Sequence, residues 1–236
     1  MPSYELVYFP IRGRGEAVRW AFAGLAHGKS VDFTFSSPTN WPEDKAAMLA
    51  ENSNPFAQLP VLKVTEESGE SFLIPESHAI LLYVQRQLAP LSGRDLIRLE
   101  SVVASTESVM VAYANQVYRG GHADDKELVA GLHAKANLFG PDGALAKYER
   151  VLQQNSALSG TDKFLVGTEF SVADALLGSI IDSIQAVEPE ALKDLPGVQA
   201  WYENVRSQPG LAEYLASGHE HRTRVSGTSI GHGTSL

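Results

Sequence analysis

The chain has 236 residues, of which 44 % are hydrophobic and 20 % are charged, and its formal net charge is −9. This composition suits a packed core and excludes a disordered chain, while the acidic balance argues against nucleic-acid binding. Cysteine is absent and no apolar run is long enough to span a membrane, which excludes disulfide scaffolds and cysteine nucleophiles and predicts a cytoplasmic protein without membrane association.

The first 88 residues alternate between strand and helix patterns. Aromatic and β-branched residues predict four strands, over residues 4–9, 31–35, 61–64 and 71–74. Apolar residues at helical spacing predict three helices, over residues 16–25, 42–51 and 78–88. A polar turn makes the last two strands a hairpin, and Ser77 is predicted to cap the third helix. The predicted order is β-α-β-α-β-β-α.

The remaining sequence has a helical pattern and no convincing strand. A first helix runs from Leu96 until Gly120, a second stretch over residues 124–154 is broken near Gly140, and two short helices begin at Pro196 and Pro209. Ser171 followed by Asp174 three residues later is typical of a helix N-terminus. The predicted domains are residues 1–88, a linker over 89–95, an all-helical domain over 96–218 and a polar tail over 219–236.

Three short motifs suggest chemistry but have simpler interpretations. The segment from Gly24 to Ser30 resembles a phosphate-binding loop, yet it has one residue too few between its glycines and follows a helix. The segment from Arg12 to Gly15 lacks the third glycine of a dinucleotide motif, so a tight turn before a helix is favoured. The histidines of the tail suggest solvent exposure more than metal binding, and we predict no metal site.

Five longer motifs indicate a function more specifically than these short segments do. Their order and spacing along the chain are similar to those of the cytosolic glutathione transferase family. Within that family they resemble the sigma class, which includes the haematopoietic prostaglandin D synthases. The motifs are Tyr4–Glu16, Asn40–Lys45, Gln58–Leu62, Glu76–Ile80 and Phe170–Asp174. The resemblance implies a thioredoxin-like N-terminal domain, an all-helical C-terminal domain and a cytoplasmic detoxifying homodimer that uses glutathione as co-substrate without a metal.

The resemblance also assigns residues to the glutathione site. A free thiol has a pKa of about 8.5, so catalysis requires a group that stabilises the thiolate. By motif match, that group is the hydroxyl of Tyr8. The other implied contacts are Arg14, Trp41 and Lys45 (the latter two near the glycine carboxylate), Gln58, Leu59 before a cis Pro60, and Glu76 with Ser77 at the γ-glutamyl end.

The electrophile is expected to bind beside the thiolate, in a pocket lined by Phe9, Ile11, Glu107, Met110 and Tyr113. Ser108 occupies the position at which members of the family often carry an acidic residue that contacts the glutathione bound by the partner subunit. The predicted activity is conjugation of glutathione to apolar electrophiles. Two alternatives stay open on the same scaffold: a glutathione-dependent isomerase such as a prostaglandin synthase, and a non-enzymatic ligand-binding or structural protein.

Overall fold

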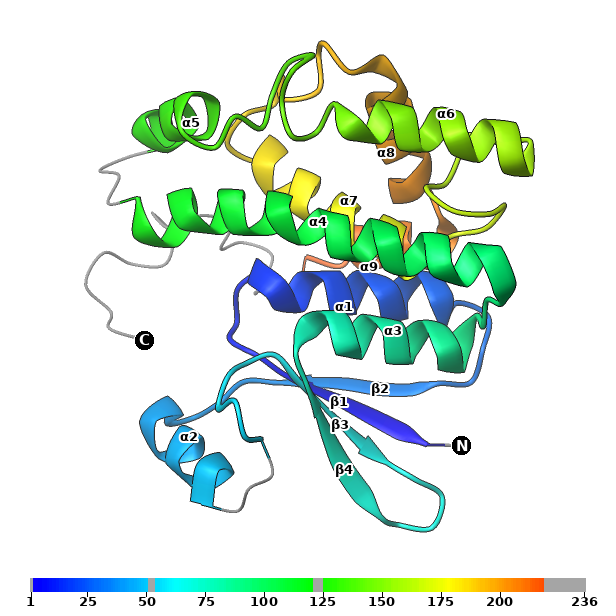
Figure 1. The fold of residues 1–236 in the computed structure, drawn as a ribbon. Helices are drawn as coiled ribbons and strands as arrows, with labels where there is room; N and C mark the ends of the chain where they lie inside the picture. The colour runs from blue at the N-terminus through cyan, green and yellow to red at the C-terminus, as the bar shows by residue number, and fades with distance from the viewer. Residues whose placement is uncertain (1, 51–53, 121–124, 219–236) are drawn as a thin grey trace.

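The computed structural model describes residues 2–50, 54–120 and 125–218 (Figure 1). The predicted polar tail over 219–236 lies outside the described residues. A sheet with its helices forms the N-terminal part, and only helices form the described C-terminal part, in agreement with the predicted fold class.

The N-terminal domain contains a four-stranded mixed sheet. Its strands are β1 (Ser3–Val7), β2 (Asp32–Ser36), β3 (Val61–Thr65) and β4 (Ser71–Pro75). The strand order is β2-β1-β3-β4, with β1 parallel to β2, and with β3 antiparallel to both β1 and β4. The predicted hairpin between β3 and β4 is therefore confirmed.

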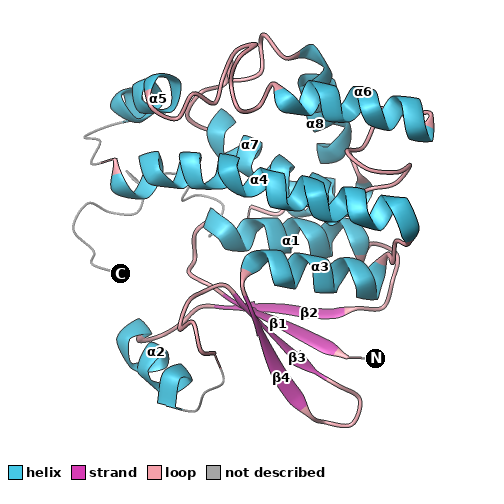
Figure 2. Cartoon of the chain, in the orientation of Figure 1, coloured by secondary structure: helices cyan, strands magenta, loops and turns pink. Residues whose placement is uncertain are grey.

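Three helices accompany this sheet: α1 (Gly13–Leu25), α2 (Trp41–Ala50) and α3 (Ser77–Leu88). Helices α1 and α3 lie side by side over one face of the sheet, and α2 stands apart at its end (Figure 2). Helix α1 buries the apolar residues that the helical spacing predicted, such as Ala17, Val18 and Phe22. It also buries Glu16 and Arg19, because helices of the second domain cover the side of α1 away from the sheet.

The C-terminal domain is built around one buried helix. Its helices are α4 (Gly93–Arg119), α5 (Asp125–Ala134), α6 (Lys147–Ser159), α7 (Val172–Gln185), α8 (Pro196–Arg206) and α9 (Pro209–Ala216). Helix α7 is buried from Val172 to Ile184 and packs against both α1 and α4. It begins with the predicted capping box of Ser171 and Asp174. One core thus joins the two domains.

Several predicted boundaries are wrong. Strand β1 ends at Val7, two residues early, because Pro10 lies in the next segment and cannot donate a backbone hydrogen bond. Helix α4 begins at Gly93, so the linker is shorter than residues 89–95. The predicted break near Gly140 is confirmed but is wider than expected, because the helices on its two sides are separated by an irregular connection over 135–146.

The start of α3 also differs from the prediction. Ser77 is the first helical residue, and the capping position belongs to Glu76, whose side chain makes no capping hydrogen bond. Glu76 has a φ of 69°, in the left-handed region that non-glycine residues rarely adopt. Such strained residues often lie at functional sites, where the surrounding fold holds them in place.

Candidate active site at the domain boundary

A polar pocket of about 350 Å³ lies between the two domains. It is lined by Arg14 of α1, Glu107 of α4, the loop residues Gln58, Leu59 and Pro60, and Glu76, Ser77 and His78 at the start of α3. Six of the nine predicted glutathione contacts therefore line one pocket. The Leu59–Pro60 peptide bond is cis, as the resemblance implied.

Tyr8 does not line this pocket but contacts Arg14, which does. The Tyr8 side chain is only 7 % exposed, and its hydroxyl oxygen accepts a hydrogen bond of 3.1 Å from the backbone N–H of Arg14. Burial raises the pKa of Tyr8, and the Arg14 N–H and the nearby Arg19 guanidinium act in the opposite direction. Tyr8 is thus a protonated phenol at neutral pH, and its hydroxyl still has a hydrogen to donate.

Two glycines make room for the Tyr8 ring. A Cβ atom at Gly13 would collide with the Tyr8 hydroxyl, and a Cβ at Gly15 would collide with the ring. Gly13 also has a φ of +44°, which favours glycine. The turn from Arg12 to Gly15 is therefore shaped around a tyrosine side chain.

A buried ion pair supports the segment that follows Tyr8. Arg19 donates hydrogen bonds to the carbonyl oxygens of Ile11 (3.0 Å) and Phe9 (3.4 Å), and pairs with Glu16 at 3.1 Å. Glu16 in turn accepts a hydrogen bond of 3.0 Å from the hydroxyl of Tyr214 in α9. Sequence analysis missed this network, although Glu16 and Arg19 are two charges among the apolar positions of α1, and charged side chains in such positions need buried partners.

Charged side chains from both domains meet in the pocket. Arg14 donates two hydrogen bonds to the Glu107 carboxylate, of 3.0 and 2.7 Å, and this contact holds the pKa of Glu107 below its ordinary value. Nε2 of His78 lies 3.2 Å from the same carboxylate. Burial lowers the pKa of His78, while Glu107 acts in the opposite direction. His78 was not among the predicted site residues.

Three predicted glutathione contacts do not line the pocket. Tyr8 is one, and the other two are Trp41 and Lys45 on α2. The Trp41 ring stands edge-on to Phe9 at 5.6 Å, and the Phe9 ring is 5.7 Å from that of Tyr8. Lys45 is exposed one turn along the same helix. Their predicted contact with the glycine carboxylate stays a prediction.

The residues that were predicted to line the electrophile pocket have different environments in the structure. Ile11, Met110 and Tyr113 are at most 7 % exposed and belong to the core. Phe9 is half-buried. Glu107 bonds Arg14 and lines the polar pocket, because α4 turns this carboxylate toward α1. The predicted contacts of these residues with the electrophile stay a prediction.

Tyr118 is a further aromatic residue that sequence analysis missed. It is exposed on α4, and its hydroxyl lies close to Gly13 on the same side as the Tyr8 hydroxyl, 3.1 Å from where a Cβ atom would stand. Because Tyr118 follows Glu107 by eleven residues, or about three helical turns, both lie on one side of α4. This eleven-residue spacing is the sequence pattern from which Tyr118 could have been placed on the same side of the helix as Glu107.

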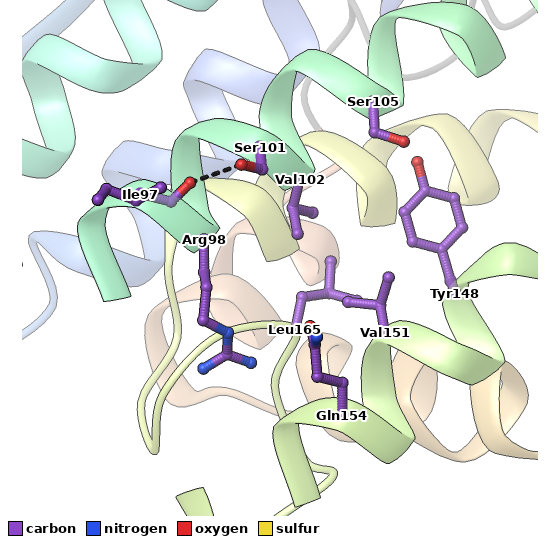
Figure 3. A pocket seen from close by; sticks show the side chains of 9 residues that line it. All are labelled: Ile97, Arg98, Ser101, Val102, Ser105, Tyr148, Val151, Gln154 and Leu165. Carbon is purple, nitrogen blue, oxygen red and sulfur yellow. Dashed lines mark hydrogen bonds between the residues drawn. The ribbon is translucent and has the colours of Figure 1, made fainter. Parts of the chain in front are cut away.

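A second cavity, of about 360 Å³, opens between α4 and α6 (Figure 3). Its charged side chain and its tyrosine hydroxyl already have partners within the protein. Arg98 bonds Asp95 and Asn155, and the Tyr148 hydroxyl donates to Thr106. We therefore assign the chemistry to the first pocket.

The described residues contain no group of three His, Asp or Glu side chains placed to hold a metal ion. None of the described helices is both long and apolar enough to cross a membrane.

Both domains of the chain are similar to known proteins. Residues 4–86 match the family model "Glutathione S-transferase, N-terminal domain", and residues 142–218 match "Glutathione S-transferase, C-terminal domain". Glutathione S-transferase P from Bos taurus is 29 % identical over 95 % of this chain and 96 % of its own.

Solved structures show the same fold. A glutathione S-transferase from Ascaris lumbricoides has a TM-score of 0.66 and 26 % identity, over 91 % of this chain and 96 % of its own. Prostaglandin synthase D from Nilaparvata lugens has a TM-score of 0.66 and 18 % identity, over 92 % of this chain and 98 % of its own, and at that identity shows the fold alone. With both family models matched in chain order, the protein belongs to the glutathione S-transferase family and is a glutathione transferase.

Proposed function

We propose that the enzyme conjugates reduced glutathione to apolar electrophiles through a thiolate that Tyr8 stabilises. The observation that carries this proposal is the state of Tyr8. Its oxygen accepts the Arg14 N–H, its pKa is raised by burial, and its hydrogen can be donated to a sulfur atom. A hydrogen bond to a charged acceptor is stronger than one to a neutral acceptor, so this donor favours the thiolate over the thiol.

The pocket offers complementary groups for the tripeptide. Ser77 lies at the N-terminus of α3, where the helix dipole favours a carboxylate, and Glu76 beside it can pair with the γ-glutamyl ammonium. Leu59, before the cis peptide bond, can present its backbone to the cysteinyl residue. Gln58 would contribute a neutral hydrogen bond.

The proposed reaction needs only the thiolate and the electrophile. The sulfur lone pair forms a bond to the electrophilic carbon, and in a substitution the leaving group departs with the electron pair of the broken bond. The thiol proton passes to solvent when glutathione binds as a thiolate. Tyr8 keeps its own proton throughout and acts as a hydrogen-bond donor.

A panel of model electrophiles tests this activity. We expect glutathione-dependent conjugation of 1-chloro-2,4-dinitrobenzene or a comparable aryl halide, measured by absorbance against a reaction without enzyme. Prostaglandin H₂ isomerisation and hydroperoxide reduction are assayed in parallel. Isomerisation without conjugation would favour the sigma-class isomerase, and no turnover in any assay would favour a ligand-binding or structural role.

We also propose that the enzyme is a cytoplasmic homodimer that packs through α4. After the first turn of this helix, and among the positions whose side chains the structure describes, the exposed residues lie at 97, 101, 104, 105, 108, 111, 115 and 118, and all but 105 have the spacing of a helix–helix seam. Ile97 and Val111 on this seam are 65 % and 41 % exposed, and Phe56 and Phe72 are further large apolar side chains at the surface. Apolar groups of this size gain free energy when a partner covers them.

Light scattering tests the dimer. We expect a mass about twice the 25.5 kDa of one chain at micromolar concentration. Val111→Asp places a charge on the seam and should shift the protein toward a monomer. Leu158→Asp is the matched control, because Leu158 is 47 % exposed on α6 and lies outside this seam. A wild-type monomer, or an equal effect of both variants, would contradict the proposal.

A further inference from the structure

His78 is a pocket residue whose chemistry the proposed reaction leaves unused. It occupies the first turn of α3, directly after Glu76 and Ser77, and its side chain is 27 % exposed. Within the described part of the chain, its buried Nε2 atom has no hydrogen-bond partner, although a Glu107 oxygen lies 3.2 Å away. A buried nitrogen without a partner is costly and is a place where a ligand oxygen can bind.

The charges of the pocket give His78 a role. Its lining contains one permanent cation, Arg14, and two carboxylates, Glu76 and Glu107. With His78 neutral, these groups sum to a net charge of −1. Glutathione carries two carboxylates and one ammonium, and as a thiolate it gains another negative charge. The pocket and its ligand therefore share the same sign, unless one more cation forms when the ligand binds.

We propose that His78 takes up a proton when glutathione binds and pairs with the γ-glutamyl carboxylate, so that glutathione affinity increases as the pH falls. This inference rests on the proposed function, because it places the γ-glutamyl end at the start of α3. His78 would be a positioning residue for the peptide and would not contact the sulfur.

The groups around His78 determine the direction of this effect. Burial and Arg14 on α1 disfavour its protonation, while Glu107 on α4 and Glu76 before α3 favour it. A bound carboxylate adds a further negative charge and raises the pKa of His78. Binding then takes up protons, and the extra affinity is present at low pH and is lost as the pH rises through the pKa of the complex.

Titration calorimetry with S-methylglutathione tests the proposal. This probe has no thiol, and its carboxylates stay ionised between about pH 5.5 and 7. We expect the dissociation constant to fall by about two- to fourfold between pH 7 and pH 5.5, because a pKa rise of about half to one unit gives its full effect of about three- to tenfold only over a wider pH range that spans both pKa values. At about pH 6.5, two buffers with different ionisation enthalpies should report net proton uptake.

Two asparagine variants separate His78 from general effects of pH. His78→Asn should bind the probe with an affinity that is nearly independent of pH and without proton uptake. His133→Asn is the matched control, because His133 also faces a glutamate, Glu188, at 3.3 Å, but outside the pocket lining. It should behave like the wild type. Thermal melts confirm that both variants fold.

The outcomes distinguish this inference from the proposed function. A wild-type enzyme that binds the probe and conjugates glutathione, but shows no proton uptake, overturns the role of His78 and leaves the transferase activity intact. That role is overturned equally if His78→Asn keeps the wild-type pH dependence. A wild type that neither binds the probe nor conjugates glutathione overturns both.

Discussion

Tyr8→Phe is expected to lower the rate of glutathione conjugation by about 10- to 150-fold. The variant keeps the ring that fills the space beside Gly13 and Gly15 and removes only the hydroxyl. One hydrogen bond to a charged group contributes roughly 1.5–3 kcal/mol, and the loss appears in full if the bond is made to the thiolate in the transition state. The KM for glutathione should change little, because the groups that bind the peptide remain.

The pH–rate profile identifies the cause of this loss. Without the Tyr8 hydroxyl, the pKa of bound glutathione should rise, so the variant needs a higher pH to reach its maximal rate. Tyr4→Phe is the matched control, since Tyr4 is also buried but lies about 13 Å back along β1, by strand rise. Full activity with an unshifted profile in Tyr8→Phe would assign thiolate stabilisation to another group, with Arg14 the next candidate.

Asp174→Ala is expected to cost about 3–5 kcal/mol of the free energy of unfolding, among the largest effects of a single substitution. Asp174 is fully buried at the start of α7. Its carboxylate accepts hydrogen bonds from the backbone N–H groups of Leu165 and Ser171 (both 2.9 Å), from the Ser171 hydroxyl (2.7 Å) and from the Trp201 indole (2.8 Å). Alanine would leave these buried donors without an acceptor.

Urea unfolding measures this loss. Asp174→Asn retains one acceptor oxygen and should lose less free energy of unfolding than Asp174→Ala. If the alanine variant does not fold, the asparagine variant should still give the higher yield of soluble protein. Asp95→Ala is the matched control, because Asp95 also lies in the first turn of a helix but is 43 % exposed in its ion pair with Arg98. Its expected loss is below about 1 kcal/mol. Equal losses at positions 95 and 174 would refute the role assigned to Asp174.

Local chemistry explains which parts of the fold were predictable. The β3–β4 hairpin and the capping box of α7 depend on residues within a few positions of one another, so their patterns could be recognised in the sequence. Tyr8, Ser77 and the cis Pro60 were assigned only through the family resemblance. Composition and spacing gave no means to choose Tyr8 over Tyr4.

The missed features depend on contacts between distant segments. The Tyr214–Glu16 hydrogen bond joins residues 198 positions apart, and His78 meets Glu107 only because α4 packs beside α3. Burial of Met110 and Tyr113 likewise follows from packing around the helices of the second domain, which periodicity alone does not define. Helical spacing placed these residues on the inner side of α4 but could not tell a core position from a pocket wall.

The close packing of Tyr8 on Gly13 and Gly15 also constrains how this site can change over evolution. While the aromatic ring is present, a larger residue at either glycine is excluded by its collision with the ring. Replacing Tyr8 by a smaller hydroxyl residue would relieve the collision with the ring at Gly15, and a side chain could then be fixed at that position. Gly13 would stay restricted to glycine, because its φ of +44° disfavours other residues whatever fills the space beside it. Once position 15 carried a side chain, the tyrosine could return only after that substitution had been reversed, so the loss of a tyrosine-based site is easier than its recovery.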